Sequence, residues 1–155
     1  MKIKTRKIVF SALFASLVCV ATMIIKIPSP LSGYVNLGDS TVLLSGFVLG
    51  PYGILAAAVG SCLADVFSGY LVYAPVTFVI KGLMAYIMYK FSKKAVIGAI
   101  VAEIIMAAGY YVFEGFLYGF SASLVNIPAN LIQAVAGFVV GMLLIDIFKK
   151  SKITF

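Results

Sequence analysis

Histidine and tryptophan are both absent from this 155-residue sequence, and acidic residues number only five. An enzyme without histidine needs paired carboxylates at one level, and the five acids are too dispersed to supply them. The sequence also lacks a zinc-ligand cluster, a phosphate-binding loop, a glycine-rich dinucleotide turn and a Ser–His–Asp set. We therefore expect no enzymatic activity, no catalytic residue, no metal and no cofactor. Cys19 and Cys62 each fall within an apolar run and are expected to be small buried side chains.

Charge is scarce as well: 11% of the residues are charged and 63% are hydrophobic. A soluble domain is nearer half apolar and a quarter charged, so this composition indicates a membrane protein. The second and third apolar runs are shorter than the roughly 20 residues that cross a bilayer, which indicates tilting, membrane thinning or burial within the bundle. We expect an all-α integral membrane protein, a compact bundle of six transmembrane helices in a single domain over residues 1–155. The six runs are 8–25, 39–49, 52–67, 74–90, 95–119 and 124–148.

Basic residues are concentrated in three segments: the amino terminus, the turn after the fourth run and the carboxy tail. With six spans these segments lie on one side, and the positive-inside rule places both termini in the cytoplasm. The net charge of +7 then reflects topology and anionic headgroups. Scattered basic residues without a recognition motif argue against nucleic-acid binding. The ten residues of these segments are Lys2, Lys4, Arg6, Lys7, Lys90, Lys93, Lys94, Lys149, Lys150 and Lys152.

Polar side chains at membrane depth are the most informative residues. A charge there costs about 3 kcal/mol or more, so it faces the interior of the bundle. The last three predicted helices each carry polar residues on one face, towards the outer half of the membrane. Amides, tyrosine rings and one charge of each sign predict a substrate pocket that is open to the outside. The candidates are Tyr73, Thr77, Lys81, Tyr110, Tyr111, Glu114, Asn126, Asn130 and Gln133.

The same polar residues permit a structural interpretation. Lys81 and Glu114 could neutralise each other across two helices, and amides often join membrane helices without a ligand. Tyrosines also form belts at the membrane interface. Asp65 could pair with Lys81 or face the loop, whereas Asp39 is expected to cap the second helix. The sequence leaves open whether Lys81 and Glu114 bind each other or a ligand.

Several segments, in this order and spacing, carry a family resemblance. They are Ser11–Ser16, Val35–Asp39, Gly46–Gly53, Gly60–Asp65, Tyr73–Pro75 and Ile80–Leu83. The whole chain resembles the S component, the substrate-binding membrane subunit, of an energy-coupling factor (ECF) vitamin transporter, in the branch of riboflavin-type and related small S components. The first-helix motif of that family is Ala-x3-Ala. Here the pairs Ser11-x3-Ala15 and Ala12-x3-Ser16 each contain one serine, which leaves open which pair is used.

The resemblance implies a high-affinity subunit of an ECF-type ABC importer in the bacterial plasma membrane. It implies binding of a vitamin or vitamin precursor outside, with Tyr34 and Asn36 of the first loop as lid contacts. Docking on a membrane coupling subunit with two cytoplasmic ATPases is then expected to use Ser11, Ala12, Ala15 and Ser16. The tyrosines favour a flat heteroaromatic ligand, such as riboflavin, pyridoxine, hydroxymethylpyrimidine or a queuosine precursor.

Two alternatives come from other functional classes. One is a membrane scaffold or assembly subunit that binds no ligand and whose polar residues only join helices. The other is a solitary small ion-coupled transporter, with Glu114 or Glu103 as the proton carrier.

Overall fold

The computed structural model describes residues 3–31 and 33–151, and most of them are helical. The expectation of an all-helical fold is confirmed. The four middle helices begin and end within one residue of the predicted runs. The Gly50-Pro51 step ends the second run, and the basic turn Ser92–Lys94 separates the fourth run from the fifth. The six long helices are α1 (Ile3–Ile24), α2 (Gly38–Leu49), α3 (Pro51–Phe67), α4 (Ala74–Lys90), α5 (Ala95–Tyr118) and α7 (Ile127–Lys150).

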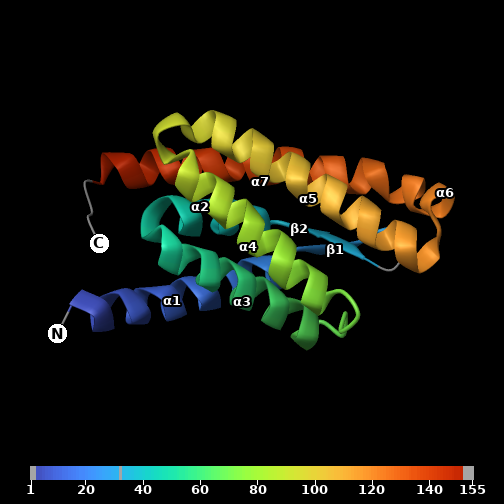
Figure 1. The fold of residues 1–155 in the computed structure, drawn as a ribbon, viewed down its shortest axis with the longest axis horizontal. Coiled ribbons are helices and arrows are strands. Elements are labelled where there is room, and N and C mark those ends of the chain that lie inside the picture. The colour runs from blue at the N-terminus through green and yellow to red at the C-terminus, as the bar shows by residue number, and fades with distance from the viewer. Residues whose placement is uncertain (1–2, 32, 152–155) are drawn as a thin grey trace.

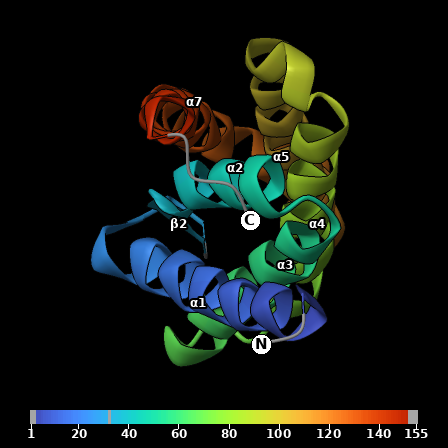
Figure 2. The same ribbon diagram turned by 90° about the vertical axis from the view of Figure 1, so that its left-hand side faces the viewer.

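Helix α2 lies at the centre of the bundle, with α1, α3, α4 and α7 packed around it (Figure 2). Ten of its 12 residues are buried. Val42 and Leu43 of α2 meet Met84 and Met88 of α4 and Met106 of α5 in a fully buried core. At 1.5 Å per residue α2 is about 18 Å long, well short of the roughly 30 Å hydrocarbon layer. Because α2 is enclosed by its neighbours, it does not have to cross the whole hydrocarbon layer, and its apolar run can be short.

Within residues 3–31 and 33–151, three stretches are long and apolar enough to cross a membrane by length and composition: Thr5–Ile24, Ser92–Tyr118 and Phe120–Lys150. The first contains most of α1, and the second joins the 3₁₀ turn η1 (Ser92–Lys94) to α5. The third joins the short α6 (Phe120–Ser123) and the turn η2 (Leu124–Asn126) to α7. The other helices are shorter, so six membrane crossings stay a prediction.

The basic segments lie together in space. The beginning of α1, the α4–α5 turn and the end of α7 all lie at the left-hand end of the bundle in Figure 1. This is the arrangement that the positive-inside argument requires. Lys2, Lys152 and the carboxy-terminal Phe155 lie outside the described residues.

Reporter fusions test the predicted topology. A fusion near Lys93 should give a cytoplasmic signal, and one near Phe120 should give an external signal, because these turns lie at opposite ends of α5. A fusion at Phe155 should be cytoplasmic. A cytoplasmic signal near Phe120 would contradict the six-span arrangement.

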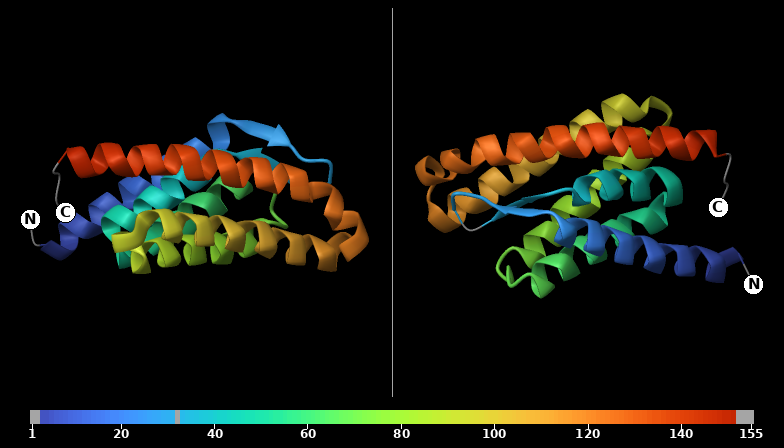
Figure 3. Two further views of the ribbon diagram at one scale, coloured as in Figure 1. Left: turned by 90° about the horizontal axis from the view of Figure 1, so that it is seen from above. Right: turned by 180° about the vertical axis from the view of Figure 1, so that it is seen from behind.

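A two-stranded hairpin between α1 and α2 is the feature that the sequence did not predict. Strand β1 (Lys26–Pro28) pairs antiparallel with β2 (Tyr34–Asn36), with Ile27 opposite Val35. The hairpin extends from the end of α1 beside α7 towards the α5–α6 end of the bundle (Figure 3). It therefore lies over the end of the bundle that is opposite the basic cluster.

Candidate functional site

A small polar cavity lies between the hairpin and helices α3, α4, α5 and α7. Its volume is about 30 Å³, which is room for one or two water molecules. Eight of the residues predicted for the pocket line this cavity, and they come from β2, the turn before α4, and helices α4, α5 and α7. These eight are Tyr34, Asn36, Tyr73, Thr77, Tyr110, Glu114, Asn130 and Gln133.

Ser29, Gly33 and Asp65 also line the cavity and were not among the predicted ligand contacts. The hydroxyl of Tyr34 donates a hydrogen bond of 2.6 Å to Oδ1 of Asp65, so this carboxylate faces the loop. Burial and the adjacent Asp65 raise the pKa of Tyr34 above its ordinary value, which keeps the hydroxyl protonated as the donor. From the sequence, Asp65 could either pair with Lys81 or face the loop. The structure places it against Tyr34 of the hairpin.

Glu114 is held by two neutral donors. The hydroxyl of Tyr73 donates to its Oε1 at 3.3 Å, and Nδ2 of Asn126 donates to the same oxygen at 2.9 Å. Asn126 also accepts a hydrogen bond from the backbone N–H of Leu31 at 3.1 Å, which connects the hairpin loop to α5. Asn126 thus supports Glu114 without lining the cavity. The second oxygen of Glu114 is buried and has no partner among the residues that the structure describes.

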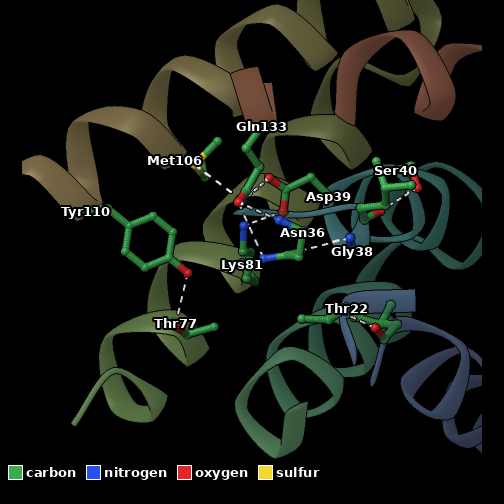
Figure 4. A network of polar contacts seen from close by, with 12 residues as sticks. Thr22, Asn36, Gly38, Asp39, Ser40, Thr77, Lys81, Met106, Tyr110 and Gln133 are labelled. Carbon is green, nitrogen blue, oxygen red and sulfur yellow. Dashed lines mark hydrogen bonds and ion pairs between the residues drawn. The ribbon is translucent and has the colours of Figure 1, made fainter. Parts of the chain in front are cut away.

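A second network of polar contacts joins four elements and shares Asn36 and Gln133 with the cavity wall (Figure 4). Lys81 of α4 forms a buried ion pair with Asp39 of α2. Gln133 of α7 donates from Nε2 to Oδ2 of Asp39 at 2.8 Å, and its Oε1 accepts the backbone N–H of Asn36 at 3.0 Å. A glutamine amide has one donor end and one acceptor end. Asp39 therefore fixes which end of Gln133 faces the hairpin.

The prediction that Asp39 caps a helix is wrong. Asp39 lies in the first turn of α2, the cap position is Leu37, and no side chain caps the helix. The carboxylate of Asp39 is fully buried and is directed at Lys81, because α2 passes through the centre of the bundle. Asp39 was not among the expected partners of Lys81, and this ion pair takes the place of the pair with Glu114 that the sequence left open.

Lys81 and Tyr111 were also predicted for the pocket and do not line the cavity. The Lys81 ammonium lies 5.4 Å from the centre of the Tyr110 ring, which forms part of the cavity wall. Tyr111 is one position, or about 100° of helix rotation, from Tyr110. Its ring therefore faces the outside of α5, where it lies 5.9 Å from the ring of Phe120.

The two small-residue pairs of α1 face different ways. The Ser11 hydroxyl donates to the carbonyl oxygen of Tyr52 at 2.9 Å. Ala15 lies against Gly60, where an added Cβ would collide with the Ala15 carbonyl. This pair therefore allows close packing of α1 on α3. Ala12 and Ser16 are exposed on the surface of α1.

The sequence profile of the family described as "ECF-type riboflavin transporter, S component" matches residues 2–150. The chain belongs to this family. This S component is therefore a membrane-embedded transporter subunit for substrate binding, and not an enzyme, as its lack of catalytic residues led us to expect.

Two known proteins resemble this S component over most of its length. A solved structure described as the S component of a bacterial ECF transporter has the same fold, with a TM-score of 0.77 and 24% identity. That match covers 95% of this chain and 97% of the other. An uncharacterized protein of Pyrococcus woesei, described as lying in the gap 3′ region, is 38% identical over 141 residues. These cover 86% of this chain and 95% of the relative.

Proposed function

We propose that this S component captures a flat heteroaromatic vitamin or vitamin precursor from outside the cell, with riboflavin as the first candidate. Unpartnered buried polar atoms are few in folded proteins. Among the residues that the structure describes, three such atoms belong to side chains that line one cavity: Oε2 of Glu114, Oδ2 of Asp65 and Nδ2 of Asn130. This convergence carries the proposal, because each atom retains hydrogen-bonding capacity for a ligand. The rings of Tyr73 and Tyr110, 6.4 Å apart, add aromatic surface.

The hairpin is proposed to act as a lid. A vitamin does not fit in a cavity of about 30 Å³, so binding requires the hairpin to move outward. Hydrogen bonds join the hairpin segment to the rest of the bundle through three pairs of residues, Tyr34–Asp65, Asn36–Gln133 and Leu31–Asn126. A ligand with several polar groups can replace such bonds. Exchange of this kind is a common way for lids to close over a substrate.

The energy for uptake is proposed to come from partner subunits. No nucleotide-binding motif is present in the sequence, so ATP hydrolysis would take place in two cytoplasmic ATPases joined through a membrane coupling subunit. The proposed location is the cell membrane, with six spans and both termini in the cytoplasm. The asymmetric distribution of lysine supports this orientation.

Ligand binding by the purified protein tests the proposal. Riboflavin, pyridoxine and hydroxymethylpyrimidine are added separately, and thermal unfolding is measured together with mass spectrometry of co-purifying compounds. A ligand at 100 times its Kd should stabilise the protein by about 2.7 kcal/mol. Absence of any stabilisation or co-purifying vitamin would favour the scaffold. Full uptake in cells that lack the coupling subunit would instead favour a solitary ion-coupled transporter.

The exposed pair on α1 is proposed as the docking face for the coupling subunit. Ala12→Trp or Ser16→Trp should reduce co-purification of the coupling subunit at least tenfold, because a large ring prevents close helix approach. Ligand binding by the isolated protein should persist, since the cavity is formed by other elements. Val139→Trp, on the exposed face of α7, is the control. Normal complex formation and uptake in both α1 variants would disprove the assignment.

A further inference from the structure

A second polar pocket lies at the basic end of the bundle, opposite the hairpin. Its volume is about 250 Å³. The beginning of α1, the turn between α2 and α3, the end of α4 and the η1 turn form its wall. These elements lie at the end of the bundle that faces the viewer in Figure 2. The pocket therefore belongs to the opposite membrane surface from the polar cavity.

Lysines from three helices lie against aromatic rings of this pocket. The three pairs are Lys7–Tyr52, Lys90–Tyr89 and Lys149–Phe47, with Nζ-to-ring-centre distances of 5.7, 5.8 and 5.4 Å. All three rings line the pocket, and Lys7 lines it directly. An ammonium group has three hydrogen-bond donors and no acceptor. A lysine held over a ring therefore keeps donors for an anion.

Acidic side chains do not balance these lysines. None of the described residues that line the pocket is acidic. Lys149 lies 3.8 Å from Oδ1 of Asp146, but both side chains are exposed, and such a pair is weak. Lys7 and Lys90 form no ion pair within the described part of the chain. The pocket thus carries positive charge that an external anion can neutralise.

The pocket lies at the depth of lipid headgroups. Lys7 immediately precedes the apolar residues of α1, and Ser92 lies in the turn between α4 and α5. Phospholipid phosphates are found just outside the hydrocarbon layer. Apolar Val48 and Leu49 line the same pocket as Lys7 and Ser92. A phospholipid matches this combination, because its phosphate is linked to apolar chains, whereas a free anion would leave the apolar wall uncovered.

We propose that this pocket binds the phosphate of an anionic phospholipid, which on the predicted orientation belongs to the cytoplasmic leaflet. Lys7 is the charged donor to the phosphate oxygens, and the Ser92 hydroxyl is a neutral donor. Lys90 and Lys149 add attraction from beside the pocket. Basic surfaces attract anionic lipids in general, and this pocket adds one defined site. The site does not depend on the identity of the vitamin.

The lipid preference of the purified protein tests the proposal. Native mass spectrometry measures the ratio of phosphatidylglycerol to phosphatidylcholine retained from mixed detergent micelles, with the same acyl chains in both lipids. The wild type should retain phosphatidylglycerol preferentially. Lys7→Gln should reduce that preference about tenfold, because it removes a charged hydrogen-bond donor. Ser92→Phe, which fills the pocket and keeps every charge, should also reduce it.

Lys94→Gln is the matched control. Lys94 is an exposed lysine of the same basic turn and does not line the pocket. In about 0.15 M salt, which screens exposed charges beyond about 8 Å, this change should alter the preference by no more than about twofold. Thermal unfolding without added lipid identifies any variant that fails to fold. Equal losses in Lys7→Gln and Lys94→Gln would reveal diffuse attraction by the whole basic end and overturn the defined site.

Three other results would also overturn the proposal. The first is a wild type that shows no preference for phosphatidylglycerol. The second is displacement of that lipid by an equal concentration of inorganic phosphate, which would identify a site for free anions. In the third, Lys7→Gln and Ser92→Phe retain the lipid normally and fail to co-purify with the coupling subunit, so the pocket is a protein contact. None of these results alters the expectation for vitamin binding at the other end of the bundle.

Discussion

Lys81→Met is expected to lower the free energy of unfolding by about 3–5 kcal/mol, since it leaves one partner of a buried ion pair without compensation. Asp39 is 0% exposed and Lys81 is 2% exposed, so water cannot take the place of the lost ammonium. Methionine keeps the approximate length of the lysine stem, which limits the change in packing. Thermal or denaturant unfolding of the purified variant measures the loss.

Two control variants separate charge from packing. The double variant Asp39→Asn/Lys81→Met removes both charges and should recover most of the stability that the single change loses. Lys90→Met alters an exposed lysine at the end of the same helix and should change stability by no more than about 0.5 kcal/mol. Equal destabilisation of the single and double variants would show that the ion pair is not the cause.

The effect of Asp39 should extend to the hairpin. Asparagine at position 39 presents a donor as well as an acceptor, so Gln133 is no longer held with Nε2 towards α2. The Oε1 atom of Gln133 should then accept the hydrogen bond from the backbone N–H of Asn36 for a smaller fraction of the time. In the proposed function, Asp39 is therefore a positioning residue for the lid, and it acts through Gln133 without touching the ligand.

Local patterns in the sequence were sufficient for the helices. Apolar runs define their lengths, and Gly50-Pro51 separates α2 from α3 so sharply that both ends were predicted within a residue. Helical periodicity also brought together side chains on one face, such as Tyr73 and Thr77, which do line the cavity. These features depend on neighbours a few positions away, which the sequence displays directly.

Long-range pairing was not predictable from the same patterns. Asp39 has the local context of a helix cap, yet its partner Lys81 is 42 positions away on another helix. The hairpin has strands of three residues each, too short for a pattern of alternation. Ser11 and Ala12 are adjacent, so their side chains point about 100° apart around α1. The position of α3 decides that Ser11 makes a contact and Ala12 is exposed. Each of these features is decided by tertiary contacts.

Glu114→Gln should weaken ligand binding by about ten- to a hundredfold, because losing one hydrogen bond to a charged group costs about 1.5–3 kcal/mol. The fold should not suffer. The glutamine oxygen can still accept from Tyr73 and Asn126, which now both donate to a single carboxylate oxygen. Only Oε2, the atom without a partner in the described chain, changes its chemistry.

The stability of the ligand-free variant makes this test decisive between receptor and scaffold. No ion pair to Glu114 is found in the part of the chain that the structure describes, so neutralising it strands no cation. A receptor therefore predicts unchanged or higher stability without ligand, together with a smaller thermal shift when riboflavin is added. A scaffold predicts lower stability and no change in the ligand-induced shift. Asp146→Asn, which neutralises an exposed carboxylate on α7, should affect neither quantity. A full shift in Glu114→Gln would remove this residue from the binding site.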